Sequence, residues 1–134
     1  MKILTKTLIV SLTISLIYFS SCISNMSFDK AMMKAASELN ESCPIMIDQD
    51  TRLDNAVVLP DNIFQFNYTL VNQTKSDIDI EQFTSRMTPK VTNSVKTNPN
   101  LEAYRDNSVT MSYYYKDQDG EFIVKISVTQ EDYK

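Results

Sequence analysis

Two different spacings of hydrophobic and polar positions alternate along the chain, and they separate helices from strands. Apolar residues recur every three or four positions over about residues 27–41, which predicts an amphipathic helix. Its apolar stripe consists of Phe28, Ala31, Met32, Ala35, Ala36 and Leu39. A second stripe with this period predicts a helical region over about residues 77–95. Pro89 lies inside this region, where it either kinks one helix or occupies the first position of another.

Alternation of apolar and polar residues, interrupted by Asn55 in the first case, predicts two strands between these helices. The first covers about residues 52–59 and places Leu53, Val57 and Leu59 on one side. A Pro-Asp-Asn turn follows, and the second strand covers about residues 63–72. The inward side chains of this second strand are Phe64, Phe66, Tyr68 and Leu70. Each strand therefore has an apolar face that needs a cover.

A β-hairpin is predicted in the last third of the chain. Residues 108–115 and 122–129 alternate in the same way on either side of an Asp-Gly pair, which is a strong hairpin signal. Tyr115 pairs either with Phe122 or with a residue two positions further along. Both registers keep the same side chains on the inner face, because side chains alternate with a period of two.

The predicted element order, α-β-β-α-β-β, is typical of an α+β domain. We expect residues 27–134 to form a single domain, with a four-stranded antiparallel sheet and both helices packed on one face. Apolar residues interrupt the otherwise polar outer face of this sheet at four positions, Ile63, Val71, Tyr114 and Ile123. They are either a binding surface for a protein or peptide partner or scattered surface residues.

Residues 1–21 have the organisation of an export signal. Lys2 and Lys6 precede a short uncharged apolar run, and two serines follow it. The run is shorter than the roughly 20 apolar residues that span a bilayer. The Phe-Ser-Ser-Cys sequence at residues 19–22 resembles the lipobox of bacterial lipoproteins, in which the cysteine is lipidated. This resemblance implies a lipoprotein signal peptide.

Lipidation of Cys22 predicts an extracytoplasmic protein that is anchored to a bacterial membrane, with residues 22–26 as a tether. The alternative is conventional cleavage, for example after Ser24, which leaves a soluble secreted or periplasmic protein. If Cys22 instead remains in a soluble mature chain, a disulfide between Cys22 and Cys43 is a further alternative.

Composition excludes several classes of function. Without Lys2 and Lys6, the chain carries 11 basic and 17 acidic residues, a net charge of −6. This charge argues against a nucleic-acid partner, because such binding depends on the neutralisation of phosphates by Lys and Arg. The sequence has no histidine, which excludes catalytic triads and His-containing zinc sites. With a single glycine it also lacks a phosphate-binding loop, so we expect no cofactor.

The segment between the first helix and the first strand holds the remaining candidates for chemistry. Cys43 is either a reactive thiol, activated by Arg52 and an Asp, or a small buried residue at the end of the helix. Asp48, Asp50 and Asp54 suggest calcium, but the spacing fails the calcium-loop pattern, because a leucine stands where the pattern needs glycine. We therefore expect a polar turn in which the acids accept hydrogen bonds from backbone amides, and no metal.

The same segment carries a resemblance to a family. The run Asn-Glu-Ser-Cys-Pro at residues 40–44, the run Asp-Thr-Arg-Leu-Asp at residues 50–54 and the aromatic strand after them resemble a family of small secreted or lipid-anchored bacterial proteins. The family is functionally uncharacterised, so the resemblance implies export and one compact domain but no catalytic residues. We therefore expect an envelope-associated binding module rather than an enzyme. The alternative is a small enzyme or thiol-dependent factor that uses Cys43.

Overall fold

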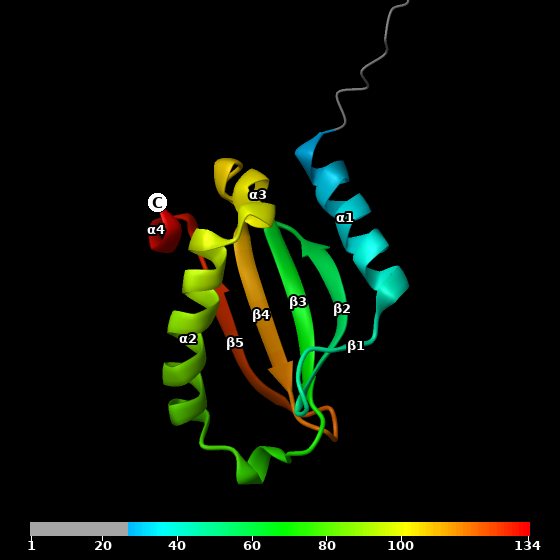
Figure 1. Ribbon diagram of the computed structural model, residues 1–134, viewed down its shortest axis with the longest axis vertical. Coiled ribbons are helices and arrows are strands. Elements are labelled where there is room, and N and C mark those ends of the chain that lie inside the picture. Colours follow the sequence, from blue (N-terminus) through cyan, green and yellow to red (C-terminus); the bar gives the residue numbers. More distant parts are fainter. Residues whose placement is uncertain (1–26) are drawn as a thin grey trace, which may run out of the picture.

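Five strands form one mixed β-sheet in the computed structural model, which describes residues 27–134 (Figure 1). In their order across the sheet, the strands are β1 (Ile45–Met46), β2 (Thr51–Leu59), β3 (Ile63–Leu70), β4 (Thr110–Lys116) and β5 (Phe122–Val128). Neighbouring strands are antiparallel except β3 and β4, which are parallel. The predicted signal peptide at residues 1–21, the lipidation of Cys22 and the tether at residues 22–26 lie outside the described residues.

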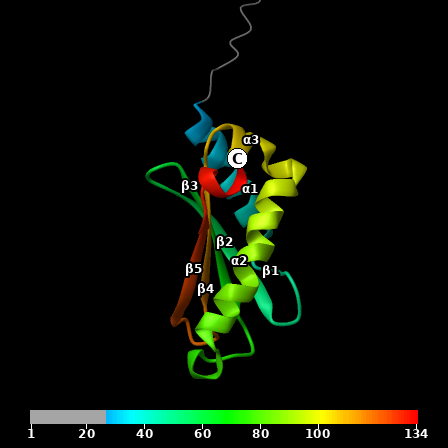
Figure 2. The same ribbon diagram turned by 90° about the vertical axis from the view of Figure 1, so that its left-hand side faces the viewer.

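Among residues 27–134, the helices cover one face of this sheet and leave the other without a helix (Figure 2). The helices are α1 (Phe28–Ser42), α2 (Ile80–Thr97), α3 (Glu102–Asp106) and α4 (Gln130–Tyr133). Two short 3-10 turns, η1 (Lys75–Asp77) and η2 (Pro99–Leu101), connect them to their neighbours. α1 packs mainly on β2, and α2 packs mainly on β5. Within the described chain, none of these helices has the length and apolarity needed to cross a bilayer.

The α+β class is confirmed, but the prediction of four antiparallel strands and two helices is wrong. The connection from β3 to β4 contains α2, which returns the chain to the end of the sheet where β3 begins. Ile63 therefore pairs with Thr110, and the two strands run in the same direction, as a helical crossover requires. The sequence prediction also missed β1, whose two residues are too few for an alternating pattern.

Pro89 lies within α2, which continues as one helix. Pro89 lies on the solvent-exposed side of this helix, where its missing backbone donor has the least effect on packing.

In the β4–β5 hairpin, the structure selects the second of the two predicted registers, in which Tyr115 pairs with Val124. The predicted inner residues of β4 keep their face in this register.

A β-bulge corrects the predicted orientation of β2. The pairing register shifts between Leu53 and Asn55, so that Asp54 is an extra residue on this strand. Leu53 is still buried, but after the bulge the residues that belong to the core or pack against it are Ala56 and Val58. The prediction that Val57 shares a face with Leu53 is therefore wrong, because one extra residue reverses the alternation.

One hydrophobic core fills the space between the sheet and the helices. Its buried members come from α1, α2 and the inner faces of the strands, and are Met32, Ala36, Ala56, Phe64, Leu70, Phe83, Val91, Val95, Val109, Met111, Tyr113, Tyr115, Ile123, Ile126 and Val128. The predicted inward faces of β3 and β4 are confirmed. Asn40 ties α1 to the sheet, because its amide nitrogen donates to the carbonyl of Ala56 at 2.8 Å and its oxygen accepts from the Ala56 amide at 2.7 Å.

Candidate functional site

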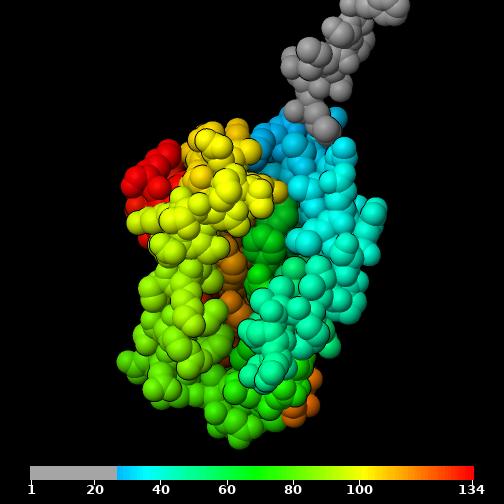
Figure 3. All heavy atoms as spheres, in the orientation of Figure 1, coloured from blue at the N-terminus to red at the C-terminus, as the bar shows by residue number. Residues whose placement is uncertain are grey.

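A cleft opens on the helical face of the sheet, between α2 and the turn that precedes β2 (Figure 3). Its volume is about 680 Å³, within the range of ligand pockets. We call it the inner cleft, and it is lined by Asp48, Gln49, Asp50, Thr51, Leu70, Gln73, Phe83, Arg86, Met87 and Lys90. In the space-filling view, atoms of β3 and β4 are visible in the hollow that continues from it between α2 and α1.

The two walls of the inner cleft have opposite charge. Asp48 and Asp50 stand on the turn, whereas Arg86 and Lys90 stand one helical turn apart on α2. None of these four side chains forms a salt bridge with another residue of the described chain. Their charges are therefore available to a bound group. Sequence analysis missed Arg86 and Lys90, because their position opposite the acids depends on where α2 crosses the sheet.

Hydrogen bonds within the turn hold the acidic wall in place. The carboxylate of Asp48 accepts from the backbone amides of Asp50 at 2.8 Å and Thr51 at 2.7 Å, which keeps its pKa below the usual range. The prediction of a polar turn is confirmed. Among residues 27–134, no group of three or more acids, cysteines or histidines is arranged to hold a metal ion.

Aromatic rings from β3 and β4 form a continuous row on the sheet beside the inner cleft. Tyr68 stacks on Tyr115 with ring centroids 5.2 Å apart, and Phe83 of α2 meets Tyr115 edge to face at 5.1 Å. Phe66 extends the row through Tyr113, with ring centroids 5.5 Å apart. Such ring pairs stabilise a site beyond their buried area. Phe66 and Tyr68 are only half-buried, so part of this row reaches solvent.

The three tyrosines in this row differ in exposure, because Tyr68 is half-buried whereas Tyr113 and Tyr115 are 7% and 3% exposed. None of the three hydroxyls forms a hydrogen bond within the described chain, and none is a fully buried polar atom without a partner, so each keeps at least a small contact with solvent. Burial of the ring, and then the nearby Cys43, raises the pKa of Tyr68 to about 12. Burial raises the pKa values of Tyr113 and Tyr115 as well. At neutral pH all three are neutral hydrogen-bonding groups rather than general bases.

The environment of Cys43 opposes an activated thiol. The side chain is half-buried, and burial, followed by the negative charge of Asp54, raises its pKa. A raised pKa keeps the thiol protonated, whereas a nucleophilic cysteine needs a lowered one. Arg52 does not compensate, because its guanidinium pairs with Asp54 at 2.6 Å. The thiol hypothesis therefore receives no support from this geometry.

Asp54 is held by a network on the outer face. Burial raises its pKa, but three hydrogen bonds to the carboxylate outweigh burial and keep the pKa below its usual range. The donors are Thr69 at 2.6 Å, Arg52 at 2.6 Å and Lys116, whose Nζ lies 3.2 Å from Oδ2. The network joins β2, β3 and β4 at one end of the sheet and fixes the bulge.

The residues on the outer face of the sheet differ from those predicted for the binding surface. Ile123 is only 4% exposed and belongs to the core, because the pairing of β5 shifts at this point and turns its side chain inward. Its predicted outward position is therefore wrong. Phe122 is 46% exposed and lies on the outer face instead, where its ring centroid is 5.0 Å from that of Tyr114. Ile63 and Val71 lie at and beyond opposite ends of β3, away from this pair. Partner binding at this surface stays a prediction.

A family model matches residues 27–124, which is most of the chain and all five strands except the end of the last one. It is described as a domain of unknown function, DUF8479. The chain belongs to this family. The description attaches no activity and no site, so the motif at residues 40–54 stays a prediction. A search of curated proteins found no match.

Solved structures share the fold at low sequence identity. A Pseudomonas aeruginosa protein described as secreted superposes with a TM-score of 0.66 at 14% identity, and the match covers 79% of this chain and 92% of the other. The pilotin EpsS of the Vibrio vulnificus type 2 secretion system gives a TM-score of 0.60 at 12% identity, with 79% and 91% covered. The type II secretion system pilotin AspS of Vibrio cholerae gives 0.58 at 13% identity, with 78% and 90% covered.

Proposed function

We propose that this protein is a lipid-anchored, extracytoplasmic binding module that holds a segment of a partner protein in the inner cleft. The observation that carries the proposal is the cleft itself, whose two walls have opposite charge and whose lining includes Phe83, where the aromatic row of the sheet meets α2. A bound segment would contact the ring of Phe83 and both signs of charge at once, with half-buried Tyr68 on the sheet beside it.

The composition of the inner cleft fits a protein partner better than a small substrate. Tyrosine, methionine and arginine are enriched in protein interfaces, where aromatic anchors and arginine contribute most of the binding energy. Arg86 and Met87 stand on the α2 wall, and Tyr68 lies on the sheet beside it. The pKa values of the tyrosines and of Cys43 are raised, so these groups supply hydrogen bonds and packing rather than acid-base chemistry.

The fold relatives support the same class of function. Two of the three are pilotins of type II secretion systems, and the third is described as secreted. We extend this class to the chain as a pilotin-like role in a bacterial envelope, with an envelope protein as the partner. Arg86, Lys90, Asp48 and Asp50 would then select a segment with complementary charges.

Charge reversal on one wall tests the inner cleft. The variant with Arg86→Glu and Lys90→Glu places two acids opposite Asp48 and Asp50, on exposed positions that leave the core intact. We expect tagged wild-type protein to capture a specific envelope protein from its native cells, and this variant to lose it. The matched control reverses two exposed lysines elsewhere, with Lys30→Glu and Lys125→Glu. Equal capture by both double variants would overturn the assignment to the cleft.

The lipid anchor has its own test. Cys22→Ser removes the proposed lipidation site, and we expect the protein to move from the membrane fraction to the soluble fraction. Cys43→Ser is the control and should leave the protein in the membrane fraction. Membrane association of Cys22→Ser would contradict the anchor without affecting the cleft.

A further inference from the structure

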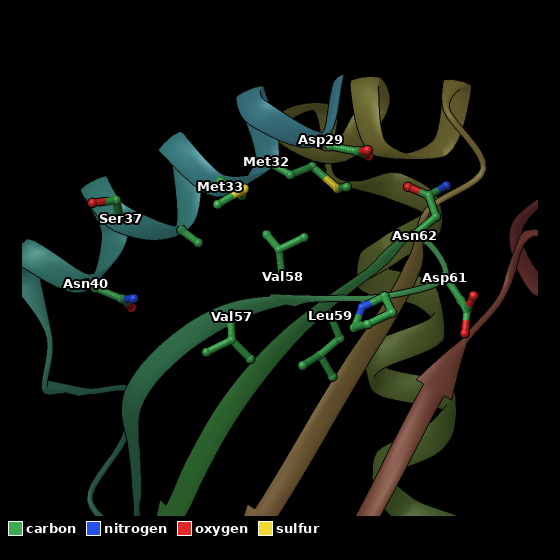
Figure 4. A pocket seen from close by; sticks show the side chains of 12 residues that line it. Asp29, Met32, Met33, Ser37, Asn40, Val57, Val58, Leu59, Asp61 and Asn62 are labelled. Atoms are coloured by element: carbon green, nitrogen blue, oxygen red, sulfur yellow. The ribbon is translucent and has the colours of Figure 1, made fainter. Parts of the chain in front are cut away.

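The outer edge of β2 has a gap next to α1, beyond the position where Asn40 bonds to Ala56. β1 pairs with this edge only at Leu53 and Arg52, so among residues 27–134 the rest of β2 has no neighbouring strand on that side. A pocket of about 680 Å³ lies here, between the open edge and α1 (Figure 4). It is separate from the inner cleft and shares no lining residue with it.

Val58 presents a free backbone donor and acceptor to this pocket. The amide and carbonyl of Ala56 point away from β3, because both are bonded to the side chain of Asn40. Backbone groups two residues apart on an antiparallel strand point to the same side, so those of Val58 point outward as well. Outside the sheet, no described residue forms a hydrogen bond with them. Pro60, two residues further, has no amide to offer.

The neighbouring helix supplies an apolar wall. Met33 is 61% exposed on α1 and lines the pocket together with Met32 and Val58. In Figure 4, Val58 points toward α1, and Met33 stands above the strand edge. A strand placed beside Val58 would turn the side chain opposite it toward these methionines, whose flexible chains adapt to varied shapes.

Two acids at one end of the pocket set the charge of an occupant. Asp29 on the first turn of α1 and Asp61 in the β2–β3 turn both line it. Both are exposed, and neither forms a salt bridge with another residue of the described chain. The pair therefore favours a cationic side chain at this end.

We propose that the open edge of β2 binds a short extended segment of a partner protein by strand addition, with an apolar residue against Met33 and a Lys or Arg beside Asp29 and Asp61. In strand addition, backbone hydrogen bonds give affinity and side-chain pockets give specificity. Here Val58 would form the backbone hydrogen bonds, and the pocket would select the side chains. Asn40 limits the length of the added segment, because its side-chain amide already forms the hydrogen bonds that a neighbouring strand would make with Ala56. The segment therefore ends or turns away at Asn40.

Amide hydrogen exchange tests strand addition directly. The probes are two randomised pools of acetylated pentapeptide amides, one with a central Lys and one with a central Glu, added to the ¹⁵N-labelled protein. We expect the Lys pool to slow exchange of the Val58 amide at least tenfold and the Glu pool to leave it within twofold. The amides of Val57 and Leu59 should not respond, because they already pair with β3. Unchanged Val58 exchange with both pools, or equal slowing by both, overturns the proposal.

Variants test whether the slowing arises at this pocket. Met33→Gln should abolish the slowing, whereas Met46→Gln, at a methionine that is 51% exposed on β1, should retain it. Asp29→Asn with Asp61→Asn should remove the difference between the pools. Slowing that needs no peptide and rises with protein concentration would identify a second copy of the chain as the occupant and overturn the proposal. The variant with Arg86→Glu and Lys90→Glu should retain the slowing, so failure of the inner cleft leaves this result intact.

Discussion

Replacement of Asn40 by alanine should destabilise the domain through the edge of β2. The side chain makes two hydrogen bonds, of 2.8 and 2.7 Å, with the backbone of Ala56, a residue that is only 1% exposed. Leaving a buried backbone donor or acceptor without a partner costs about 1–3 kcal/mol for each group. Water can enter at the open edge after truncation, which holds the cost for both groups near the lower limit, at about 2–3 kcal/mol.

Helix propensity offsets part of this loss. Alanine is favoured over asparagine inside a helix by up to about 0.7 kcal/mol, and Asn40 lies in the last turns of α1. The expected net decrease in the free energy of unfolding is therefore about 1.5–2.5 kcal/mol, or roughly 5–10 °C in Tm for a domain of this size. Urea denaturation followed by circular dichroism measures it, with an unchanged slope as evidence that the native state is intact.

Asn93→Ala is the matched control. Asn93 is exposed within α2, and its side chain makes no hydrogen bond in the described chain, so this change should leave the stability unchanged or raise it slightly.

Asn40→Asp keeps the shape of the side chain but turns an oxygen toward the Ala56 carbonyl, so the new carboxyl should have a raised pKa in the folded state. Its stability deficit at pH 7 should then shrink as the pH falls below that pKa, because the protonated acid donates again. Asn40→Ala within about 0.5 kcal/mol of Asn93→Ala would refute the reasoning.

Three further predictions concern individual side chains. Asp117 is 2% exposed, and although burial raises its pKa, backbone amides of the hairpin turn and of Lys75 outweigh burial and lower the pKa. Asp117→Asn should therefore reduce stability most near neutral pH, and urea titrations should show the difference vanish as the pH falls through the folded pKa. Arg105→Ala should cost about 1.5–3 kcal/mol of unfolding free energy, because Arg105 donates to the Val95 and Asn98 carbonyls at the end of α2. Cys43 should react with a maleimide more slowly than a free thiol at neutral pH, and rates equal to those in denaturant would contradict its raised pKa.

Periodicity was sufficient to predict the longer regular elements. α1, β3 and the β4–β5 hairpin lie within one or two residues of their predicted bounds, because each buries one face and the burial repeats along many residues. The two bulges escaped prediction for a physical reason. Asp54 and Ile123 are single extra residues, and a single residue reverses the alternation without changing its period. At Ile123 the signal is hidden further, because apolar residues stand on both sides of it.

The inner cleft follows from the topology, which periodicity does not contain. Because α1 packs on β2 and α2 packs on β5, the helices cover the two sides of the sheet, and the middle strands β3 and β4 receive the least cover. The sequence did carry one clue. Three inward positions of these strands are tyrosines, Tyr68, Tyr113 and Tyr115, where a dry core would accept Phe or Leu. A buried phenol needs a hydrogen-bond partner or solvent, and no described residue bonds to these hydroxyls. Tyrosines in a row on a core face therefore indicate a place where the core comes close to solvent, here at half-buried Tyr68.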